Sequence, residues 1–229
     1  MTAVLRREEK YLLTLEEALR CAARFEKVLT PDDFSRHGPY QIRSLYFDTV
    51  DDRDFHDKLT EQNRRRKIRL RIYSPEDAHA KLELKQKENA CQKKRSLLVP
   101  RRDALALIDG RYSVLLNYGD PLAGELFVLL TEGCYRPRTI VEYRRRAFTA
   151  RENNTRLTFD SGVRALEGDF RLFSRTLPLY PILPGDRAIL EVKYSRFLPG
   201  YIMDLLRCVD RRSVSASKYC LGRSLSYPF

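Results

Sequence analysis

The sequence has no tryptophan, only two methionines and three histidines, and no long hydrophobic run. Apolar runs such as residues 126–130 are far too short to cross a bilayer, which needs about 20 residues. Residues 1–6 lack the apolar segment of a signal peptide. We therefore expect a soluble, cytoplasmic protein without a transmembrane segment in this chain. The absence of tryptophan, of an RRM-like aromatic motif and of a helix-turn-helix signal disfavours nucleic acid as a partner.

The five cysteines are scattered, odd in number and form no CxxC pair. This spacing argues against a structural zinc site or a disulfide framework and favours reduced thiols. The histidines, His37, His56 and His79, fall in expected loops or turns. The chain is therefore poor in candidates for a general base.

The positive charge, in contrast, is abundant. The 229 residues carry a net charge of +12, and 32% of them are charged. Such an excess favours an anionic partner: phosphate chains, nucleotides, nucleic acid or a membrane surface. The length suits one sizeable core. With no internal repeat and no linker, residues 1–229 are predicted to form a single domain.

Basic and apolar residues alternate in two neighbouring segments, residues 67–73 and 81–87. A strand sends successive side chains to opposite faces, so Arg69 and Arg71 share one face while Leu70 lies on the other. A solvated sheet face normally mixes charges of both signs to limit repulsion between cross-strand neighbours. The pattern predicts two strands with a basic face that contacts a polyanion. It also predicts that removing Arg69 and Arg71 relieves repulsion and keeps or raises stability.

Periodicity predicts the remaining elements. Thr14 and Glu17 form a capping box that opens an amphipathic helix. Pro100 and Pro121 each open a helix, as proline does at a first helical position. The expected strands are 3–13, 40–48, 67–73, 80–87, 91–99, 138–149, 155–161 and 188–194, and the expected helices are 15–29, 100–110, 122–131, 200–209 and 213–222. Residues 51–61 are expected to form a short helix or a turn.

Several of the strands have one apolar face and one rich in arginine and lysine with a few acidic residues. If helices cover the apolar sides, the charged faces turn inward, and closing such an antiparallel sheet gives a barrel with a polar lumen. We therefore predict an α+β fold, an eight-stranded antiparallel barrel tunnel with a basic lumen, flanked by helices. An open sheet with its basic face in solvent is the alternative.

A set of motifs in fixed order resembles a known family, the VTC domain, which is the polyphosphate polymerase branch of the triphosphate tunnel metalloenzymes. The resemblance runs from about residue 3 to residue 223. The motifs are Arg6-x-Glu8-x-Lys10-Tyr11, Ser44-Leu45-Tyr46-Phe47-Asp48-Thr49, Ile68-Arg69-Leu70-Arg71-x-Tyr73, Leu82-Glu83-Leu84-Lys85, Tyr143-x-Arg145, Thr155-Arg156-Leu157-Thr158-x-Asp160, Leu190-Glu191-x-Lys193 and Ser217-Lys218-Tyr219.

The resemblance implies a divalent metal, Mn²⁺ or Mg²⁺, and synthesis of inorganic polyphosphate from the γ-phosphate of ATP. It assigns the reaction's phosphate contacts to Lys10, Arg69, Arg71, Lys85, Arg145, Arg156 and Lys218. Further substrate contacts fall on Tyr143, Ser217, Lys58, Lys93, Arg95 and Lys193, and metal ligands on Glu191 and Glu8. The wider superfamily begins with Glu-x-Glu-x-Lys, and Arg6 stands where the first glutamate would be. This departure fits the VTC branch better than a cyclase or thiamine-triphosphatase.

Two other classes of function remain open at this point. One is a hydrolase of tripolyphosphate or nucleoside triphosphates on the same tunnel. The other is a module that binds polyphosphate without turning it over. Neither the oligomeric state nor a regulator or membrane partner follows from the residues.

Overall fold

The protein is described here by a computed structural model, which covers residues 6–89, 91–209, 214 and 217–226. It is an α+β protein whose strands belong to one sheet, and all the pairings with a defined register are antiparallel. Its elements are β1 (Arg6–Thr14), α1 (Leu15–Glu26), β2 (Thr30–Pro31), η1 (Asp33–Ser35), β3 (Tyr40–Asp48), α2 (Arg53–Leu59), β4 (Arg64–Ile72), β5 (His79–Glu88), β6 (Cys91–Pro100), α3 (Arg101–Ile108), η2 (Tyr112–Asn117), α4 (Pro121–Glu132), β7 (Arg136–Thr149), η3 (Glu152–Asn154), β8 (Arg156–Glu167), β9 (Tyr180–Pro181), β10 (Arg187–Ser195), α5 (Gly200–Leu205), η4 (Leu206–Cys208) and α6 (Lys218–Arg223).

The strand order along the sheet is β1-β10-β8-β7-β3-β4-β5-β6, with β2 paired to β7 and β9 paired to β8. This confirms the antiparallel α+β class that the alternation predicted. No pairing among the described residues joins the two end strands, β1 and β6. Closure of the sheet into an eight-stranded tunnel therefore stays a prediction.

Contacts divide the chain into two compact units, each built from separate stretches of sequence. Unit 1 comprises Met1–Gln41, Glu142–Arg164 and Pro181–Ser217, and unit 2 comprises Ile42–Val141, Ala165–Tyr180 and Lys218–Phe229.

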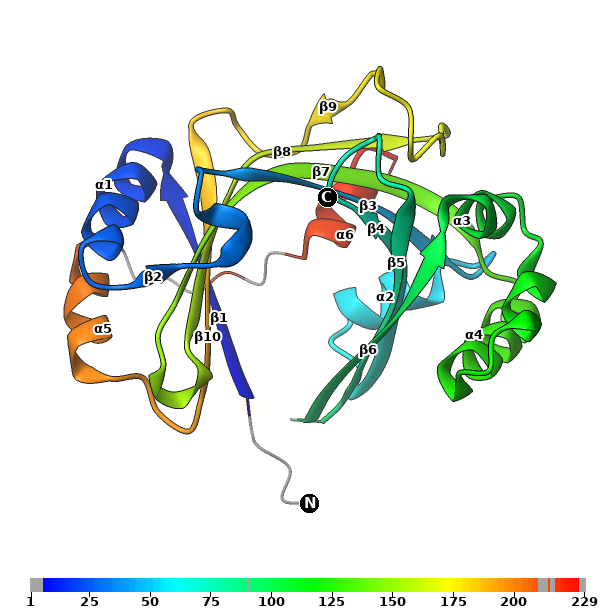
Figure 1. The fold of residues 1–229 in the computed structure, drawn as a ribbon, viewed down its shortest axis with the longest axis horizontal. Helices are drawn as coiled ribbons and strands as arrows, with labels where there is room; N and C mark the ends of the chain where they lie inside the picture. Colours follow the sequence, from blue (N-terminus) through cyan, green and yellow to red (C-terminus); the bar gives the residue numbers. More distant parts are fainter. Residues whose placement is uncertain (1–5, 90, 210–213, 215–216, 227–229) are drawn as a thin grey trace. The chain divides into compact units, whose positions relative to one another are not determined.

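In unit 1, α1 covers the apolar face of β1, β10 and β8. The capping box predicted from the sequence is present: the Thr14 hydroxyl accepts from the Glu17 amide at 3.1 Å, and the Glu17 carboxylate accepts from the Thr14 amide at 2.8 Å. Phe25 of α1 is fully buried and packs edge-on against Phe148. In Figure 1, α1 and α5 lie on the same side of β1 and β10. The opposite face of these strands therefore carries the charged residues.

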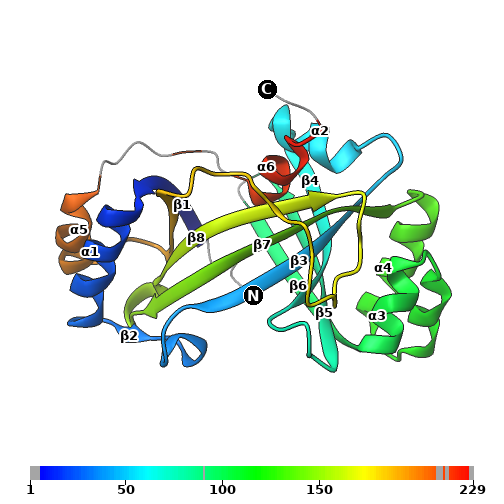
Figure 2. The same ribbon diagram turned by 90° about the horizontal axis from the view of Figure 1, so that it is seen from above.

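In unit 2, α3 and α4 cover the apolar face of β4, β5 and β6, as Figures 1 and 2 show. Leu70, Leu82 and Leu126 are completely buried in this core. Pro121 opens α4 and Asp120 caps it by accepting from the Leu122 amide at 2.8 Å. The alternation of residues 67–73 and 81–87 thus has the predicted meaning, with leucines under the helices and basic residues on the other face.

The sequence-based boundaries differ from the structure at several places; helix α5, for example, ends at Leu205 rather than at residue 209. Helix α1 ends at Glu26 rather than near residue 29, because the chain turns there to form β2, where Thr30 pairs with Thr149. Strand β8 continues to Glu167, well past the predicted end at residue 161. Helix α6 begins at Lys218, and the predicted helical residues 213, 215 and 216 lie outside the described part of the chain. Across the described residues, no helix has both the length and the apolarity needed to cross a membrane.

Candidate functional site

The register of unit 2 gathers cations on the face of the sheet away from α3 and α4. Arg69 lies directly opposite Glu83, and Lys67 lies opposite Lys85. Residues directly opposite one another on neighbouring antiparallel strands share a face. The hairpin between β5 and β6 continues the same face by placing Lys94 opposite Lys85. We call this surface, made of Lys67, Arg69, Arg71, Glu83, Lys85 and Lys94, the basic face of unit 2.

Glu83 is the centre of the basic face. Its side chain is 2% exposed, its Oε2 lies 2.6 Å from Arg69 Nε and 3.8 Å from Arg71 Nη1, and its Oε1 pairs with Lys94 Nζ. Burial by itself would raise the pKa of Glu83, but the positive charges of Arg69, Arg71 and Lys94 outweigh it and hold that pKa far below its usual range. One carboxylate is shared by three cations, so the face keeps an excess of positive charge.

Strand β3 supports the two arginines from the other side. Tyr46 and Ser44 lie opposite Arg69 and Arg71 in the register. Arg69 Nη1 donates to the Tyr46 hydroxyl at 3.0 Å, and Arg71 Nε donates to Ser44 Oγ at 3.2 Å. Arginines held in this way present the rest of their donors in a fixed direction, which suits recognition of phosphate oxygens.

The structure separates Lys93 and Arg95 from the basic face, contrary to the grouping expected from their spacing. Arg95 lies on the side covered by α4, where its Nη2 donates to Glu125 at 2.6 Å, and Lys93 lies opposite Gln86 on that side. Glu88 pairs with Cys91 in the register, so odd positions of β5 face even positions of β6. Lys94, which the sequence reasoning missed, occupies the place on the basic face that was expected for Lys93 and Arg95. The number of residues between the two predicted strands could have indicated this register.

Lys58 lies on a helix and not on a strand. It belongs to α2, and its Nζ lies 3.5 Å from the Glu61 carboxylate.

In unit 1, the register brings a second charged cluster together on the face away from α1. Lys10 lies opposite Glu191, and Glu8 lies opposite Lys193. Lys10 Nζ is 3.2 Å from Glu8, and Lys193 Nζ contacts Glu191 and lies 3.8 Å from Glu8. The two lysines thus alternate with the two glutamates. Glu191, predicted as a metal ligand, is part of this network rather than isolated.

Two arginines of unit 1 that the resemblance assigned to phosphate, Arg145 and Arg156, are each paired with an aspartate. Arg145 is buried and donates from Nε and Nη2 to both oxygens of Asp160, at 2.6 and 2.7 Å. Burial by itself would lower the pKa of Arg145, but the charge of Asp160 outweighs it and the pKa is raised. Arg145 Cζ also lies 5.3 Å from the Tyr143 ring centroid. Arg156 Nη2 donates to Asp32 at 2.6 Å.

The two clusters differ in charge. Lys10, Lys193, Arg145 and Arg156 of unit 1 each contact a carboxylate, whereas Arg69, Arg71 and Lys94 of unit 2 share Glu83. The acidic partners in unit 1 are Glu8 on β1, Glu191 on β10, Asp160 on β8 and Asp32 beside η1. Asp32, which lies next to η1, is 124 residues away from Arg156 in sequence, so spacing gave no signal for this pair.

Ser217 and Lys218 stand at the start of α6, and both are buried. By the division above, Ser217 falls in unit 1 and Lys218 in unit 2. The next residue, Tyr219, is almost completely buried and its hydroxyl donates to Asp48.

A divalent cation has a limited set of protein ligands here. Among the described residues, no group of three or more His, Cys, Asp or Glu side chains is arranged to hold a metal. Glu8 and Glu191 are the two carboxylates of the unit 1 cluster, linked through Lys193. Mg²⁺ typically binds one or two carboxylates together with substrate phosphates rather than a complete protein cage. The pair fits a metal of that kind and does not fit a structural metal site.

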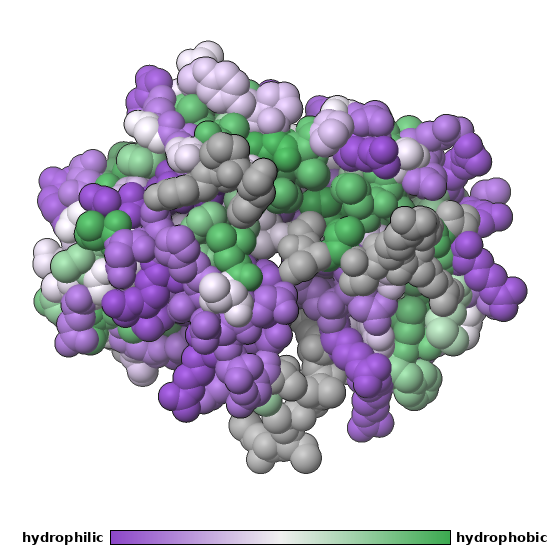
Figure 3. Space-filling model, turned by 180° about the vertical axis from the view of Figure 1, so that it is seen from behind, coloured by the Kyte–Doolittle hydropathy of each residue, from purple (hydrophilic) through white to green (hydrophobic). Residues whose placement is uncertain are grey.

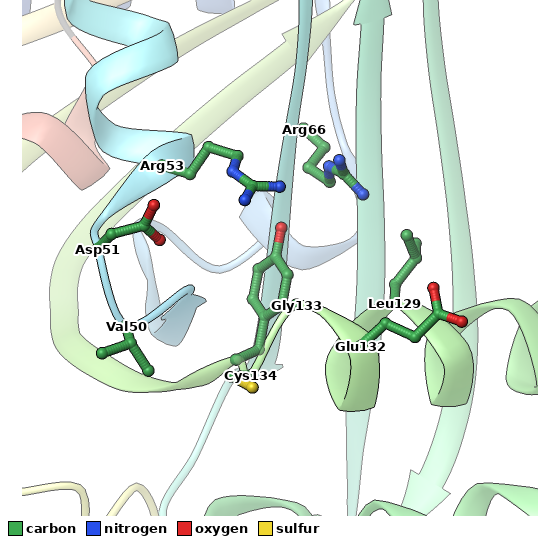
Figure 4. Close-up of a pocket in the computed structure, with 9 residues that line it drawn as sticks. Val50, Asp51, Arg53, Arg66, Leu129, Glu132, Gly133 and Cys134 are labelled. Atoms are coloured by element: carbon green, nitrogen blue, oxygen red, sulfur yellow. The ribbon is translucent and has the colours of Figure 1, made fainter.

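A pocket of about 460 Å³ lies elsewhere in unit 2. Figure 4 shows Arg53 from α2 and Arg66 from β4 reaching into it, with Leu129 and Glu132 contributed by α4. None of its nine lining residues belongs to the sequence-predicted site. Hydrophilic residues predominate on the face of the molecule shown in Figure 3, in keeping with the 32% of charged residues.

Comparison with known proteins gives a family model and several similar structures. A proposed adenylate cyclase from Bacillus halodurans has a TM-score of 0.53 at 13% identity, with 93% of each chain covered. Two proteins of Pyrococcus horikoshii have TM-scores of 0.46 and 0.47 at 12% identity, with 94% of this chain and 98% and 97% of theirs covered. The likeness to the Bacillus protein shows a shared fold. No curated protein matches the sequence.

The family model that matches is the VTC domain, over residues 5–227. This span includes every motif on which the resemblance was based. The chain therefore belongs to the VTC domain family.

Proposed function

We propose that this protein is a metal-dependent polyphosphate polymerase that transfers the γ-phosphate of ATP to a growing chain of inorganic polyphosphate. Membership of the VTC domain family supports a tunnel enzyme acting on polyphosphate or nucleotides. The observation that carries the proposal is the basic face of unit 2, where Arg69, Arg71 and Lys94 share the single carboxylate of Glu83. A surface with this charge excess and these fixed donors suits a row of phosphates.

The arginines act by position and charge. Arg69 and Arg71 are two residues apart on β4, so their guanidinium groups lie on the same face of the strand. They can therefore hold neighbouring phosphates of one chain. Phosphoryl transfer needs mainly alignment and charge neutralisation from the protein. Lys85 and Lys218 would add point charges on unit 2, and Lys10, Arg145, Arg156 and Lys193 would do so on unit 1. Tyr143 and Ser217 would add hydrogen bonds. Lys93 and Arg95 are left out, because they lie on the side of the sheet that α4 covers. Lys58 of α2 would add a further basic contact.

The reaction balances without a protein base. A terminal oxygen of the polyphosphate chain, already ionised, attacks the γ-phosphorus of ATP, and the bond from that phosphorus to the β–γ bridging oxygen breaks. ADP leaves, and the chain is longer by one phosphate. This agrees with a site in which the structure offers no histidine among the clustered residues it describes.

Glu191, with Glu8, would hold the Mn²⁺ or Mg²⁺ that the family implies. Bound there, such an ion would supply positive charge that offsets the charge of the phosphates. Lys10 and Lys193 would then exchange part of their contact with the glutamates for phosphate.

Product length tests the proposal against its alternatives. The purified protein is incubated with ATP and Mn²⁺, and the products are sized on a gel and assayed for free phosphate. Long polyphosphate with stoichiometric ADP supports the polymerase. Release of phosphate from ATP or tripolyphosphate without long chains would replace it with the hydrolase, and tight tripolyphosphate binding with no product would leave a binding module.

A further inference from the structure

The start of α6 is held by a buried carboxylate, that of Asp48, which is not among the proposed phosphate contacts. Asp48, at the end of β3, is completely buried. Its Oδ1 accepts from the amides of Thr49 and Asp54 at 2.8 and 2.9 Å, and its Oδ2 accepts from the Phe55 amide at 2.9 Å. The same Oδ2 accepts from the Tyr219 hydroxyl. A carboxylate held by three backbone amides of unit 2 therefore fixes one residue of α6.

Tyr219 is held on its other sides as well. Its ring stacks on that of Tyr46, with centroids 5.1 Å apart and planes inclined by 27°, and it meets the Phe55 ring edge-on at 6.2 Å. Burial, the charge of Asp48 and the hydrogen bond to it all raise the pKa of Tyr219, so the hydroxyl stays a donor. The orientation of this residue is therefore set by several contacts at once.

The remainder of the helix is anchored too. Arg223 donates to Asp52 and to Glu167, each at 2.7 Å. Gly222 lies so close to β7 that an added Cβ would stand 2.9 Å from Val141 Cγ2 and 3.1 Å from Thr139 Oγ1. In Figure 2, α6 lies beside α2, the element whose first amides bind Asp48. Lys218 is the first residue of this short helix, and its side chain is buried.

We propose that Asp48 and Tyr219 are positioning residues that hold Lys218 where it binds phosphate. This rests on the proposed function, which makes Lys218 a phosphate contact. A lysine is a point charge on a flexible stem, so its contribution depends on where its backbone is held. The Tyr219–Asp48 hydrogen bond fixes the adjacent residue, and through it the backbone of Lys218.

The test is a double-mutant cycle on binding, which requires no turnover. Tripolyphosphate affinity is measured by calorimetry at fixed ionic strength for the wild type, Tyr219→Phe, Lys218→Ala and the double variant. Phenylalanine keeps the ring and its stack on Tyr46, so only the hydroxyl bond is removed. We expect Tyr219→Phe to raise Kd about tenfold in the wild-type background and to have little further effect once Lys218 is alanine.

Two variants complete the design. Asp48→Asn removes the charge from the other partner and is expected to weaken binding to a similar extent. Tyr118→Phe is the matched control, because it removes a tyrosine–aspartate hydrogen bond of 2.6 Å, to Asp103, in the helical layer of unit 2. It should leave Kd unchanged. Melting temperatures establish that each variant is folded at the temperature of the titration.

These measurements distinguish failure of the proposed function from failure of the positioning role of Asp48 and Tyr219. A wild-type protein that does not bind tripolyphosphate would end the proposed function itself. If the wild type binds, an unchanged Kd in Tyr219→Phe overturns the positioning role. A rise in Kd that is equally large in the Lys218→Ala background also overturns it, because the hydroxyl would then act on the fold and not through Lys218.

Discussion

Glu83 is the residue on which the basic face of unit 2 depends. Replacing it with glutamine leaves Arg69, Arg71 and Lys94 without their shared counter-charge. Breaking a fully buried ion pair costs about 3–5 kcal/mol, and the half-exposed Lys94 reduces this, so we expect Glu83→Gln to lower the free energy of unfolding by about 2–3 kcal/mol. Urea titration measures it.

The control for this variant is Glu125→Gln, which removes the carboxylate partner of Arg95. Both of these side chains are substantially exposed, at 36% and 28%. An exposed pair contributes about 0–1 kcal/mol, so this change should be small. Equal losses from Glu83→Gln and Glu125→Gln would contradict the central role of Glu83.

Removing Arg69 and Arg71 together should abolish polyphosphate synthesis, because both fixed guanidinium groups are lost from the basic face. The sequence predicted unchanged or higher stability through relief of repulsion. The structure favours a lower melting temperature, since the buried Glu83 loses two of the three cations that contact it among the described residues. Thermal unfolding beside a product gel checks both effects. Full polymer synthesis by the double alanine variant would remove these residues from the proposed site.

Asp54 should make stability fall as the pH rises. Burial and the negative charge of Asp48 raise the pKa of Asp54 to about 7 from an ordinary 3.8. Between these values the unfolded chain has lost a proton that the native protein still binds, so the free energy of unfolding decreases with increasing pH from about 4 to about 7. Urea titrations across this range should show a decrease on the order of a few kcal/mol.

The matching variant is Asp54→Asn. In the native protein the Tyr135 hydroxyl donates to the Asp54 carboxylate at 2.9 Å, and asparagine keeps an oxygen that can accept this hydrogen bond. This variant should lose most of that pH dependence. A wild-type slope that persists unchanged in Asp54→Asn would assign the effect to another group.

At the scale of elements, two glycines should respond to alanine with opposite signs. Gly222 of α6 faces β7 at contact distance, so its added Cβ would crowd Val141 and Thr139, and overpacking costs about 1–3 kcal/mol. Gly124 of α4 has no atom within 4 Å of an added Cβ, and alanine is favoured over glycine in a helix by about 1 kcal/mol.

We therefore expect Gly222→Ala to lower the melting temperature and Gly124→Ala to raise it. The two variants serve as controls for one another, since each adds the same methyl group to a helix. A stabilising Gly222→Ala would show that α6 can move away from β7, and would weaken the account of how Lys218 is held.

At the scale of the whole molecule, metal and ligand should have separate effects. A chelator should abolish polymer synthesis, because the proposed reaction depends on a metal. It should leave the melting temperature unchanged, because the described residues form no group of three or more metal ligands. Tripolyphosphate should raise the melting temperature, since a ligand that binds only the folded protein stabilises it by about 2.7 kcal/mol at 100 times its Kd. A large drop in melting temperature with chelator alone would indicate a structural metal.

The sequence by itself determined the local elements and the division of each strand into an apolar and a charged face. The capping box at Thr14, the helix start at Pro121 and the strand 40–48 follow from short-range rules, because hydrogen bonds to nearby amides, fixed φ and side-chain alternation depend only on neighbouring residues. Pro100, predicted to open a helix, instead ends β6 and caps a helix that begins at Arg101. The motifs also determined the family.

Only the tertiary structure decided which charges neutralise one another. The β5–β6 register places Lys94, and not Lys93 or Arg95, beside Glu83, and the fold brings Asp32 to Arg156 and Tyr219 to Asp48 across long stretches of sequence. The physical reason is that an ion pair or hydrogen bond requires atoms within a few ångströms of one another. Strand register and packing set such distances, whereas alternation fixes only the side of the strand.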